Sequence, residues 1–303
     1  MKITLDEILN IHKGEPCLIL GSGGSLNKLN FENFTGKIIA LGSTILRLKK
    51  LEKISYFVSA NNHFPIPEID FHLNFLNNLT KTTWLMSDTA AYNDIWKKND
   101  LFLNEKIKIN WLSFDDRHFK NKPCNPVKAC CDIAVENKNN LTLQEYFFKK
   151  MLNTNDFIKP VSVAEFGIMF AILFGCNPIY IAGIDMPKEN YWGHQSNKEY
   201  FGYESNFANE FLDKTNKLIK KKYFFYYLKN LNLFPYLHSA YLQLVGKILK
   251  KSFFAFDMDR FEKNFEKIVN VAIRNEQEII NLGSSDIIKN TKGIKSLKIE
   301  NLS

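Results

Sequence analysis

The run PCLIL at residues 16–20 is followed at once by GSGGSL at residues 21–26. A short, uninterrupted apolar run predicts a strand that is buried on both faces, as in a parallel sheet covered by helices. Three more runs of this kind, each ending at small or polar residues, lie at residues 37–41, 54–59 and 83–87. These runs predict an α/β fold with a mostly parallel sheet.

The second half of the chain repeats the alternation of helix and strand. We predict an apolar helix that ends before Gly175, because glycine commonly follows the last turn of a helix. The segment at residues 104–140 is polar, and we predict a strand and loops there. The remaining predicted elements are helices at 3–11, 161–174 and 259–278 and strands at 178–182 and 278–282.

The order of these elements predicts a Rossmann-like α/β domain with helices on both faces of a mostly parallel sheet. Residues 216–256 have a different character, because lysine clusters alternate with aromatic runs such as YFFYY at residues 223–227. We predict that residues 1–215 and 257–303 form the Rossmann-like domain and that residues 216–256 form a helical insertion. The insertion is either a lid on the core or a contact to an anionic membrane surface.

The composition is that of a globular protein, with 45% hydrophobic and 24% charged residues in a chain of 303. The formal net charge of +8 favours an anionic partner, although a lysine-rich composition alone explains the same charge.

No apolar stretch reaches the roughly 18–20 residues that span a bilayer, and residues 1–15 do not resemble a secretory signal, so we expect a cytoplasmic protein. The 5 cysteines lack C-x-x-C spacing, which predicts reduced thiols and no zinc site.

Glycine and serine follow the predicted strands at the edge where an open parallel sheet binds its ligands. Backbone amides in such turns can approach an anion closely, and a helix starting after Ser25 would add the positive end of its dipole. We therefore predict a site for a phosphate-bearing ligand, although turns of this composition also serve only to connect strands. The turns are at residues 21–25, 42–43, 61–62, 183–185 and 283–285.

Two common nucleotide-binding motifs do not fit the first turn. No Gly-Lys-Ser/Thr follows Gly21 at the spacing of a P-loop. Gly21 and Gly23 match the start of a dinucleotide fingerprint, but Leu26 stands at the place of the third glycine. Residues 42–43 also lack the acidic residue that binds the ribose of NAD. The sequence therefore argues against a P-loop enzyme and against a dehydrogenase.

Three stretches resemble a known bacterial group. HKGEPCLILGSGGSLNKLN (12–30) is similar to the opening of the motility accessory factor (Maf) glycosyltransferases and of archaeal pterin pyrophosphokinase-like proteins, which share a domain of unknown function 115. It is also similar to the opening of the glycosyltransferase family 42 sialyltransferases. PVSVAEFGIMFAILFGCNPIYIAGIDM (160–186) and IINLGSSDIIKN (279–290) resemble later parts of the same proteins.

The resemblance implies a metal-independent enzyme that binds a CMP-linked nonulosonic acid, a sialic-acid-like sugar. The first turn would face the phosphate and ribose of this donor, Ser162 its carboxylate, and Asp185 would close its strand beside the nucleotide. Ser43 stands where the family has an asparagine, and Tyr191 is nearest to the tyrosines that hold the phosphate. The implied donor-binding residues are Gly21, Ser22, Gly23, Gly24, Ser25, Ser43, Asn61, Ser162, Asp185, Tyr191, Ser284 and Ser285.

The segment YWGH at residues 191–194 is similar to the Y-x-G-H of the sialyltransferases, whose histidine is the general base. A histidine with a pKa of about 6.5 is suited to removing the proton of an acceptor hydroxyl. His194 is therefore the catalytic residue that the resemblance implies, and a surface or structural histidine is the alternative. Asp115 and Asp116 are adjacent and followed by Arg117, which predicts a solvated turn rather than a metal site.

Together these observations predict an inverting glycosyltransferase that transfers such a sugar from CMP to a cell-surface glycan, a lipid-linked acceptor or a protein. It would need no metal and no other cofactor. Two alternatives stay open: a magnesium- and ATP-dependent pyrophosphokinase similar to the pterin enzymes, and a non-catalytic protein that binds nucleotide sugars.

If residues 216–256 bind a membrane, we expect this to be the inner face of the cytoplasmic membrane. Nucleic acid is not an expected partner, because no known nucleic-acid-binding module is recognised, and a homo-oligomer is left open.

Overall fold

The structure of the protein is a computed structural model, and it describes only part of the chain. The described residues are 3–21, 23, 25–26, 29–48, 51–59, 79, 81–87, 110–114, 141–154, 158, 160, 162–185, 258–283 and 285–297. In chain order, their strands and helices are β1 (Cys17–Leu20), β2 (Lys37–Leu41), η2 (Gly42–Arg47), η3 (Leu51–Lys53), β3 (Tyr56–Ser59), β4 (Thr83–Ser87), β5 (Asn110–Phe114), α5 (Leu143–Leu152), α6 (Val163–Leu173), β6 (Ile179–Ala182), α9 (Met258–Arg274), β7 (Ile279–Asn281), α10 (Asp286–Asn290) and β8 (Ile294–Ser296).

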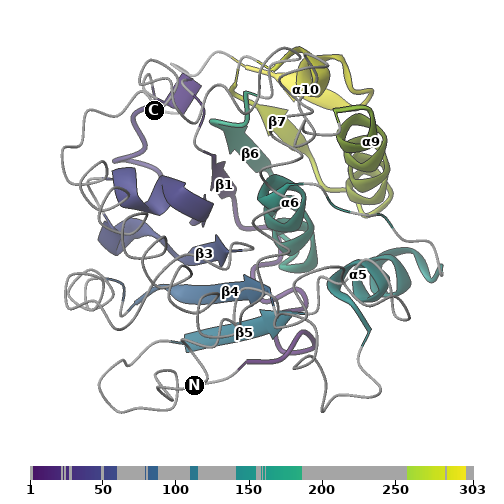
Figure 1. The fold of residues 1–303 in the computed structure, drawn as a ribbon, viewed down its shortest axis with the longest axis horizontal. Coiled ribbons are helices and arrows are strands. Elements are labelled where there is room, and N and C mark those ends of the chain that lie inside the picture. The colour runs from purple at the N-terminus through teal and green to yellow at the C-terminus, as the bar shows by residue number, and fades with distance from the viewer. Residues whose placement is uncertain are drawn as a thin grey trace, which may run out of the picture.

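The strands form one 8-stranded sheet in the order β5-β4-β3-β2-β1-β6-β7-β8. All neighbouring pairs are parallel. The chain moves from β1 outward to β5 and then returns to the other side of β1, where β6, β7 and β8 lie side by side (Figure 1). The direction of winding therefore changes between β1 and β6, which is the switch point of a Rossmann-like sheet.

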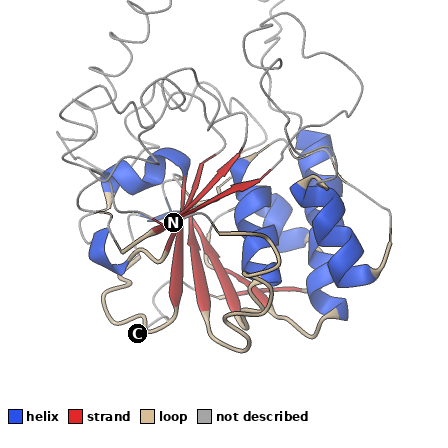
Figure 2. Cartoon of the chain, turned by 90° about the horizontal axis from the view of Figure 1, so that it is seen from below, coloured by secondary structure: helices blue, strands red, loops and turns tan. Residues whose placement is uncertain are grey.

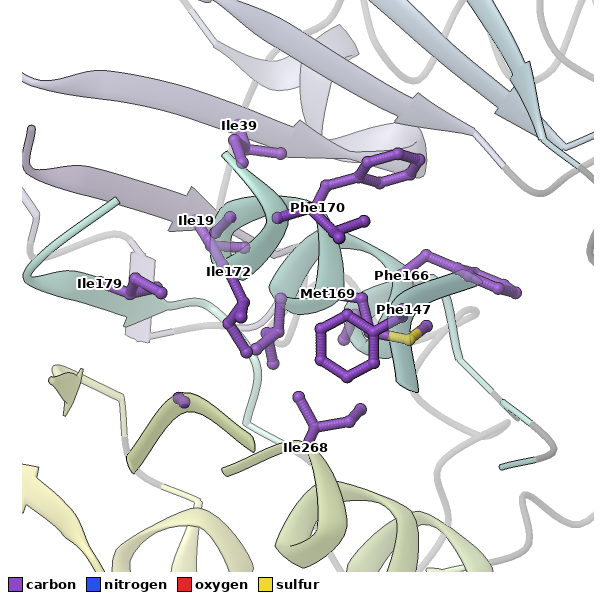
Figure 3. Close-up of a cluster of buried hydrophobic side chains, with 14 of the residues drawn as sticks. Ile19, Ile39, Phe147, Phe166, Met169, Phe170, Ile172, Ile179 and Ile268 are labelled. Carbon is purple, nitrogen blue, oxygen red and sulfur yellow. The ribbon is translucent and has the colours of Figure 1, made fainter. Parts of the chain in front are cut away.

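Helices lie on both faces of the sheet, as predicted. The helices α5, α6 and α9 cover one face, and the 3-10 helices η2 and η3 lie on the other (Figure 2). The helix α6 is buried along almost its whole length between the sheet and the helices α5 and α9. Its side chains Phe166, Met169 and Phe170 pack among Ile19, Ile39, Phe147 and Ile268, which form the centre of the core (Figure 3).

The described strands confirm those predicted from the apolar runs, with small changes at their ends. β2 and β4 match the predicted bounds, and β5 lies in the polar segment where one strand was predicted. The helix α9 ends at Arg274 rather than at residue 278, because the Gln277 side chain donates hydrogen bonds to the carbonyls of Ile172 and Cys176. This contact holds the chain beside α6 and turns it toward β7.

One predicted helix is not found, and a helix after Ser25 stays a prediction because residues 27–28 lie outside the described residues. Residues 25–26 have 3-10 geometry, and the Leu26 N–H donates to the Gly23 carbonyl at 3.2 Å. Residues 3–14 form turns instead of a helix. The amides of Asn10, His12 and Gly14 donate to the carbonyls of residues 173–175 at the end of α6, at 2.8–2.9 Å. These tertiary bonds replace the hydrogen bonds that a helix would need.

Side chains of the same N-terminal segment bind the helix α5. The Tyr146 hydroxyl donates to Asp6 at 2.8 Å, and the Lys150 ammonium lies 3.0 Å from the same carboxylate. These hydrogen bonds, with Lys150 first, lower the pKa of Asp6. Burial is the main cause that raises the pKa of Tyr146. The segment is thus fixed to α5 as well as to α6.

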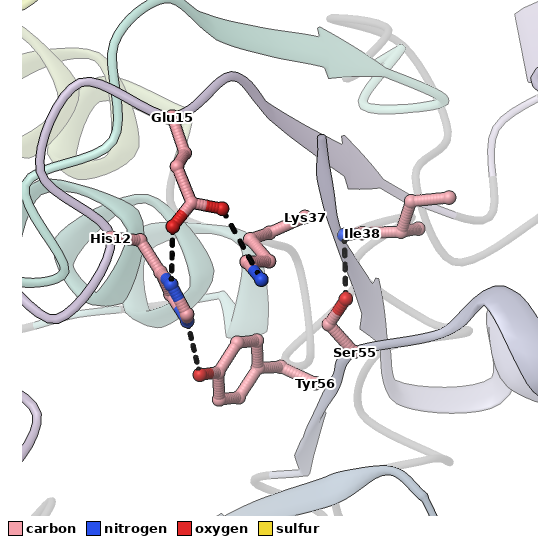
Figure 4. Close-up of polar contacts among 6 residues, drawn as sticks. All are labelled: His12, Glu15, Lys37, Ile38, Ser55 and Tyr56. Carbon is pink, nitrogen blue, oxygen red and sulfur yellow. Dashed lines mark hydrogen bonds and ion pairs between the residues drawn. The ribbon is translucent and has the colours of Figure 1, made fainter. Parts of the chain in front are cut away.

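A polar cluster joins the N-terminal segment to the amino ends of β2 and β3 (Figure 4). The His12 Nδ1 lies 3.2 Å from Glu15 Oε1, and its Nε2 lies 2.6 Å from the Tyr56 hydroxyl. Lys37 lies 3.2 Å from the other oxygen of Glu15. The His12 ring also packs edge-on against Phe174 at 5.7 Å between ring centroids. Burial lowers the pKa of His12, against the opposing effect of Glu15.

We expect this cluster to make stability depend on pH near neutrality. The pKa of His12 is lower in the folded chain than the usual value of about 6.5, so the unfolded chain binds its proton first. The contribution of neutral His12 is present above that value and is lost as the pH falls below it. We expect the free energy of unfolding, measured in urea, to fall more steeply between pH 7.5 and pH 5.5 in the native chain than in H12Q. Equal slopes in the two chains would contradict this role.

The predicted insertion at residues 216–256 lies outside the described residues, so the domain bounds stay a prediction. The chain nevertheless returns to the same sheet after it, because β7 and β8 continue the order beyond β6. Among the described helices, none has the length and apolar character needed to cross a bilayer.

Candidate functional site

Three turns meet at the carboxyl ends of β1, β6 and β7, beside the switch point of the sheet. The first turn begins at Gly21, the second runs over residues 183–185 and the third includes Gly283. These strands are neighbours in the sheet, so their carboxyl ends open at one edge (Figure 1). An open parallel sheet binds its ligands at this place.

The first two turns approach so closely that only glycine fits between them. A methyl group on Gly21 would lie 2.3 Å from the Gly183 carbonyl oxygen, and one on Gly183 would lie 2.4 Å from the Gly21 oxygen. Gly183 also has a φ of +69°, a region that residues with a side chain rarely adopt. A methyl group on Gly23 would lie 2.3 Å from an oxygen of Asp185. Close backbone packing therefore explains these glycines.

Hydrogen bonds continue the pairing of β1 with β6 beyond the strands. The Gly21 amide donates to the Ala182 carbonyl at 2.8 Å, and the Gly23 amide donates to the Gly183 carbonyl at 2.7 Å. The Ser25 amide donates to Asp185 Oδ2 at 2.7 Å. In return, the Gly183 amide donates to Ser25 Oγ at 3.2 Å. The turn after β1 is thus bound at four points to the turn after β6.

This pairing changes the role expected for the first turn. We predicted that its amides would approach a phosphate, but the amides of Gly21, Gly23 and Ser25 already donate to β6 or to Asp185. An anion at these three amides would have to displace protein acceptors and approach the Asp185 carboxylate. These three amides therefore have acceptors within the protein, and their predicted contact with a phosphate stays a prediction.

The third turn brings further oxygen atoms to the same place. Asn281 ends β7 and is buried, and its Oδ1 accepts the Gly283 amide at 2.9 Å. A methyl group on Gly283 would lie 3.2 Å from Asp185 Oδ1, 3.2 Å from Asn281 Oδ1 and 3.5 Å from Ser25 Oγ. Three oxygen atoms from three strand ends therefore surround Gly283. Asn281 was not among the predicted site residues, whereas Gly283 belongs to the turn at residues 283–285 that the sequence placed at this edge.

Ser162 caps the helix α6 at the same edge of the sheet. Its side-chain oxygen accepts the Ala164 amide at 3.0 Å, and Glu165 Oε2 accepts the Ser162 amide at 2.7 Å, which forms a capping box. Glu165 is buried, and its Oε1 accepts from the Asn264 amide group of α9 at 2.6 Å. The serine therefore has a structural role, and its predicted contact with a sugar carboxylate stays a prediction.

Ser285 and Ser43 also lie near the carboxyl edge. The Ser285 side chain is buried and accepts the Ile288 amide at 3.4 Å, where it caps α10. Ser43 lies within η2, directly after β2. The neighbouring Gly42 approaches Val163 of α6, since a methyl group there would lie 3.9 Å from that side chain. The predicted contacts of both serines with a donor stay predictions.

The structure thus brings Gly21, Gly23, Ser25 and Asp185 together, and it adds Asn281 and Gly283 to them. Within the described ranges, no group of three or more histidine, cysteine or acidic side chains is arranged to hold a metal ion. The other predicted site residues lie outside the described residues: Ser22, Gly24, Asn61, Tyr191, His194 and Ser284.

Comparison with known proteins gives one structural likeness. No family model matches the chain, and no curated protein matches its sequence. Among solved structures, the chain is similar to the Maf glycosyltransferase from Magnetospirillum magneticum AMB-1, with 12% identity and a TM-score of 0.44. The match covers 97% of this chain but 35% of that protein's chain, so this chain spans about a third of its length.

Proposed function

We propose that this protein is a glycosyltransferase that binds a nucleotide-linked sugar at the carboxyl edge of β1, β6 and β7. The observation that carries the proposal is the meeting of the three turns around Gly283, with Ser25 hydrogen-bonded to Asp185. This is the place where Rossmann-like sheets bind nucleotides, and the turns lack the motifs of P-loop enzymes and dehydrogenases. The resemblance of residues 12–30, 160–186 and 279–290 to transferases supports the same class.

The donor in this proposal is a CMP-linked nonulosonic acid, and the acceptor is a hydroxyl of a cell-surface glycan, a lipid-linked glycan or a protein. The acceptor oxygen forms a bond to the anomeric carbon while the bond from that carbon to the phosphate oxygen breaks, which inverts the configuration. His194 takes the acceptor proton, and CMP leaves with the negative charge. No metal takes part in this step. We place the protein in the cytoplasm, with residues 216–256 as a lid or as a contact to an anionic membrane.

A ligand panel tests the class of donor. CMP, CDP, UDP, ATP and NAD are each added to the protein, and the melting temperature is measured. CMP at about 100 times its dissociation constant should stabilise the chain by about 2.7 kcal/mol. We expect CMP to raise the melting temperature more than ATP or NAD does. Selective stabilisation by ATP or NAD would contradict the proposal, and so would a melting temperature that no nucleotide raises.

Two controls then separate an enzyme of this class from its alternatives. H194A should keep CMP binding but lose about 10²- to 10⁴-fold in transfer rate, and H118A should keep both. An unchanged transfer rate in H194A would show that His194 is not the base. CMP binding by the native chain without any transfer would favour a non-catalytic protein. EDTA should leave the transfer rate unchanged, because the proposed step needs no metal. Loss of activity in EDTA would favour the magnesium-dependent pyrophosphokinase.

A further inference from the structure

The helix α6 begins at the carboxyl edge of the sheet with a capping box whose glutamate is buried. Glu165 Oε2 accepts the Ser162 amide at 2.7 Å, and Glu165 Oε1 accepts the side-chain amide of Asn264 at 2.6 Å. Glu165 is 0% exposed and Asn264 is 6% exposed. One buried carboxylate therefore joins the first turn of α6 to a side chain of α9, which comes 99 residues later in the chain.

The burial of this glutamate is not needed for capping alone. The helix α5 begins with the same kind of capping box, yet its Glu145 is only partly buried. Moving a carboxylate out of water costs free energy, and well-packed apolar side chains often replace buried charges without loss of stability. The buried pair of Glu165 and Asn264 therefore calls for a role besides stability, and what the pair holds in place is Ser162.

Ser162 keeps one hydrogen-bond donor for a ligand. Its oxygen accepts the Ala164 amide at 3.0 Å, but a hydroxyl also has a proton to donate, and within the described ranges no acceptor takes this proton. Ser162 is partly exposed, and the next residue, Val163, lies beside Gly42 at the end of β2. The Ser162 hydroxyl can therefore donate to an anionic group at the edge of the sheet where the proposed site lies.

We propose that Asn264 is a positioning residue that acts through Glu165 to hold the Ser162 hydroxyl toward the sugar carboxylate of the donor. Without the Asn264 contact, the Glu165 carboxylate is free to turn away from the Ser162 amide, and the first turn of α6 is less firmly held. The inference rests on the proposed function, because the CMP-linked nonulosonic acid of that proposal carries the carboxylate. It gives α9 a part in donor binding that the sequence did not predict.

Calorimetric titration with a matched pair of ligands tests this inference. CMP lacks the sugar carboxylate, and CMP-N-acetylneuraminic acid carries it, so the native chain should bind the second ligand more tightly. N264A should bind CMP-N-acetylneuraminic acid about 10-fold more weakly than the native chain does, because a hydrogen bond to a charged group is weakened. It should bind CMP as the native chain does, which also shows that the variant is folded. N270A is the control, since Asn270 is an exposed residue of the same helix, and it should bind both ligands normally.

A double-mutant cycle separates positioning from a purely structural role. S162A should bind CMP-N-acetylneuraminic acid about 10- to 100-fold more weakly than the native chain does. Adding N264A to S162A should change this binding little further, because no hydroxyl is left to position. Additive effects of the two substitutions would overturn the inference, and so would an equal weakening of both ligands in N264A.

Two further outcomes separate this inference from the proposed function. A native chain that binds CMP and CMP-N-acetylneuraminic acid equally tightly would overturn the inference, because the sugar carboxylate would then have no partner, and the site for CMP would stand. Failure of both ligands to bind the native chain would overturn the proposed function itself.

Discussion

Replacing Gly183 with alanine should lower the free energy of unfolding by about 2–5 kcal/mol. Two effects add. The φ of +69° disfavours any residue with a side chain by about 1–2 kcal/mol. The new methyl group would also lie 2.4 Å from the Gly21 carbonyl oxygen, a backbone atom that moves only if the turn moves, and such overpacking costs about 1–3 kcal/mol. Urea unfolding of G183A measures the sum.

Gly14 supplies the matched control for this prediction. Its φ is +78°, but an added methyl group would meet nothing within 4 Å. G14A should therefore lose only the backbone contribution of about 1–2 kcal/mol. The difference between the two variants measures the close approach of the turns after β1 and β6. If G183A and G14A lose the same stability, the two turns are not packed as described.

The same substitution should also affect the site. To relieve the contact, the turn after β1 must move away from β6, which breaks the hydrogen bond between the Ser25 amide and Asp185. We therefore expect G183A to lose nucleotide binding even at temperatures where it stays folded, while G14A keeps it. Native-like binding by G183A would show that the turn is not part of the binding surface.

Glu165→Ala should destabilise the protein by about 2–4 kcal/mol. Both carboxylate oxygens of Glu165 accept hydrogen bonds, one from the Ser162 amide and the other from Asn264. An alanine has no accepting oxygen, so both donors would lose this acceptor at a site where the native side chain is fully buried. A buried donor without an acceptor costs about 1–3 kcal/mol, and more when a charged group is lost. Thermal and urea unfolding of E165A measure this effect.

The helix α5 offers a matched capping box for comparison. Glu145 accepts the Thr142 amide at 2.8 Å, as Glu165 does for Ser162, but its side chain is only partly buried. In E145A water can reach the Thr142 amide, so this variant should lose at most about 1 kcal/mol. Similar losses in E165A and E145A would contradict the buried role of Glu165.

The sequence was a good guide to the sheet and a weaker guide to the helices. Apolar runs predicted β1, β2, β3, β4, β6 and β7, because a strand that is buried on both faces leaves a local signal. The helix α5 was not predicted, although its capping box at Thr142 and Glu145 is a readable start signal. The helix predicted at residues 3–11 was wrong, since the partners of its amides are at the end of α6, far along the chain.

The sequence predicted which strand ends lie at one edge of the sheet, but it did not predict the contacts between them. The turns after β1, β6 and β7 lie together at that edge, as expected for parallel neighbours. A sequence, however, does not show whether the amide of Ser25 faces an anion or a carboxylate, and here its partner Asp185 is 160 residues away. Asn281 was missed for the same reason, because only the fold places it beside Ser25 and Asp185.

The position of β1 in the middle of the sheet has a consequence for synthesis on the ribosome. β1 pairs with β2 on one side, and that partner is made soon afterwards, but the other edge of β1 pairs with β6 at residues 179–182. A nascent chain must therefore carry an open apolar strand edge until most of its length has been translated, and such edges attract other strands. Chaperones that shield this edge should thus favour soluble protein, and fragments that stop before β6 should aggregate.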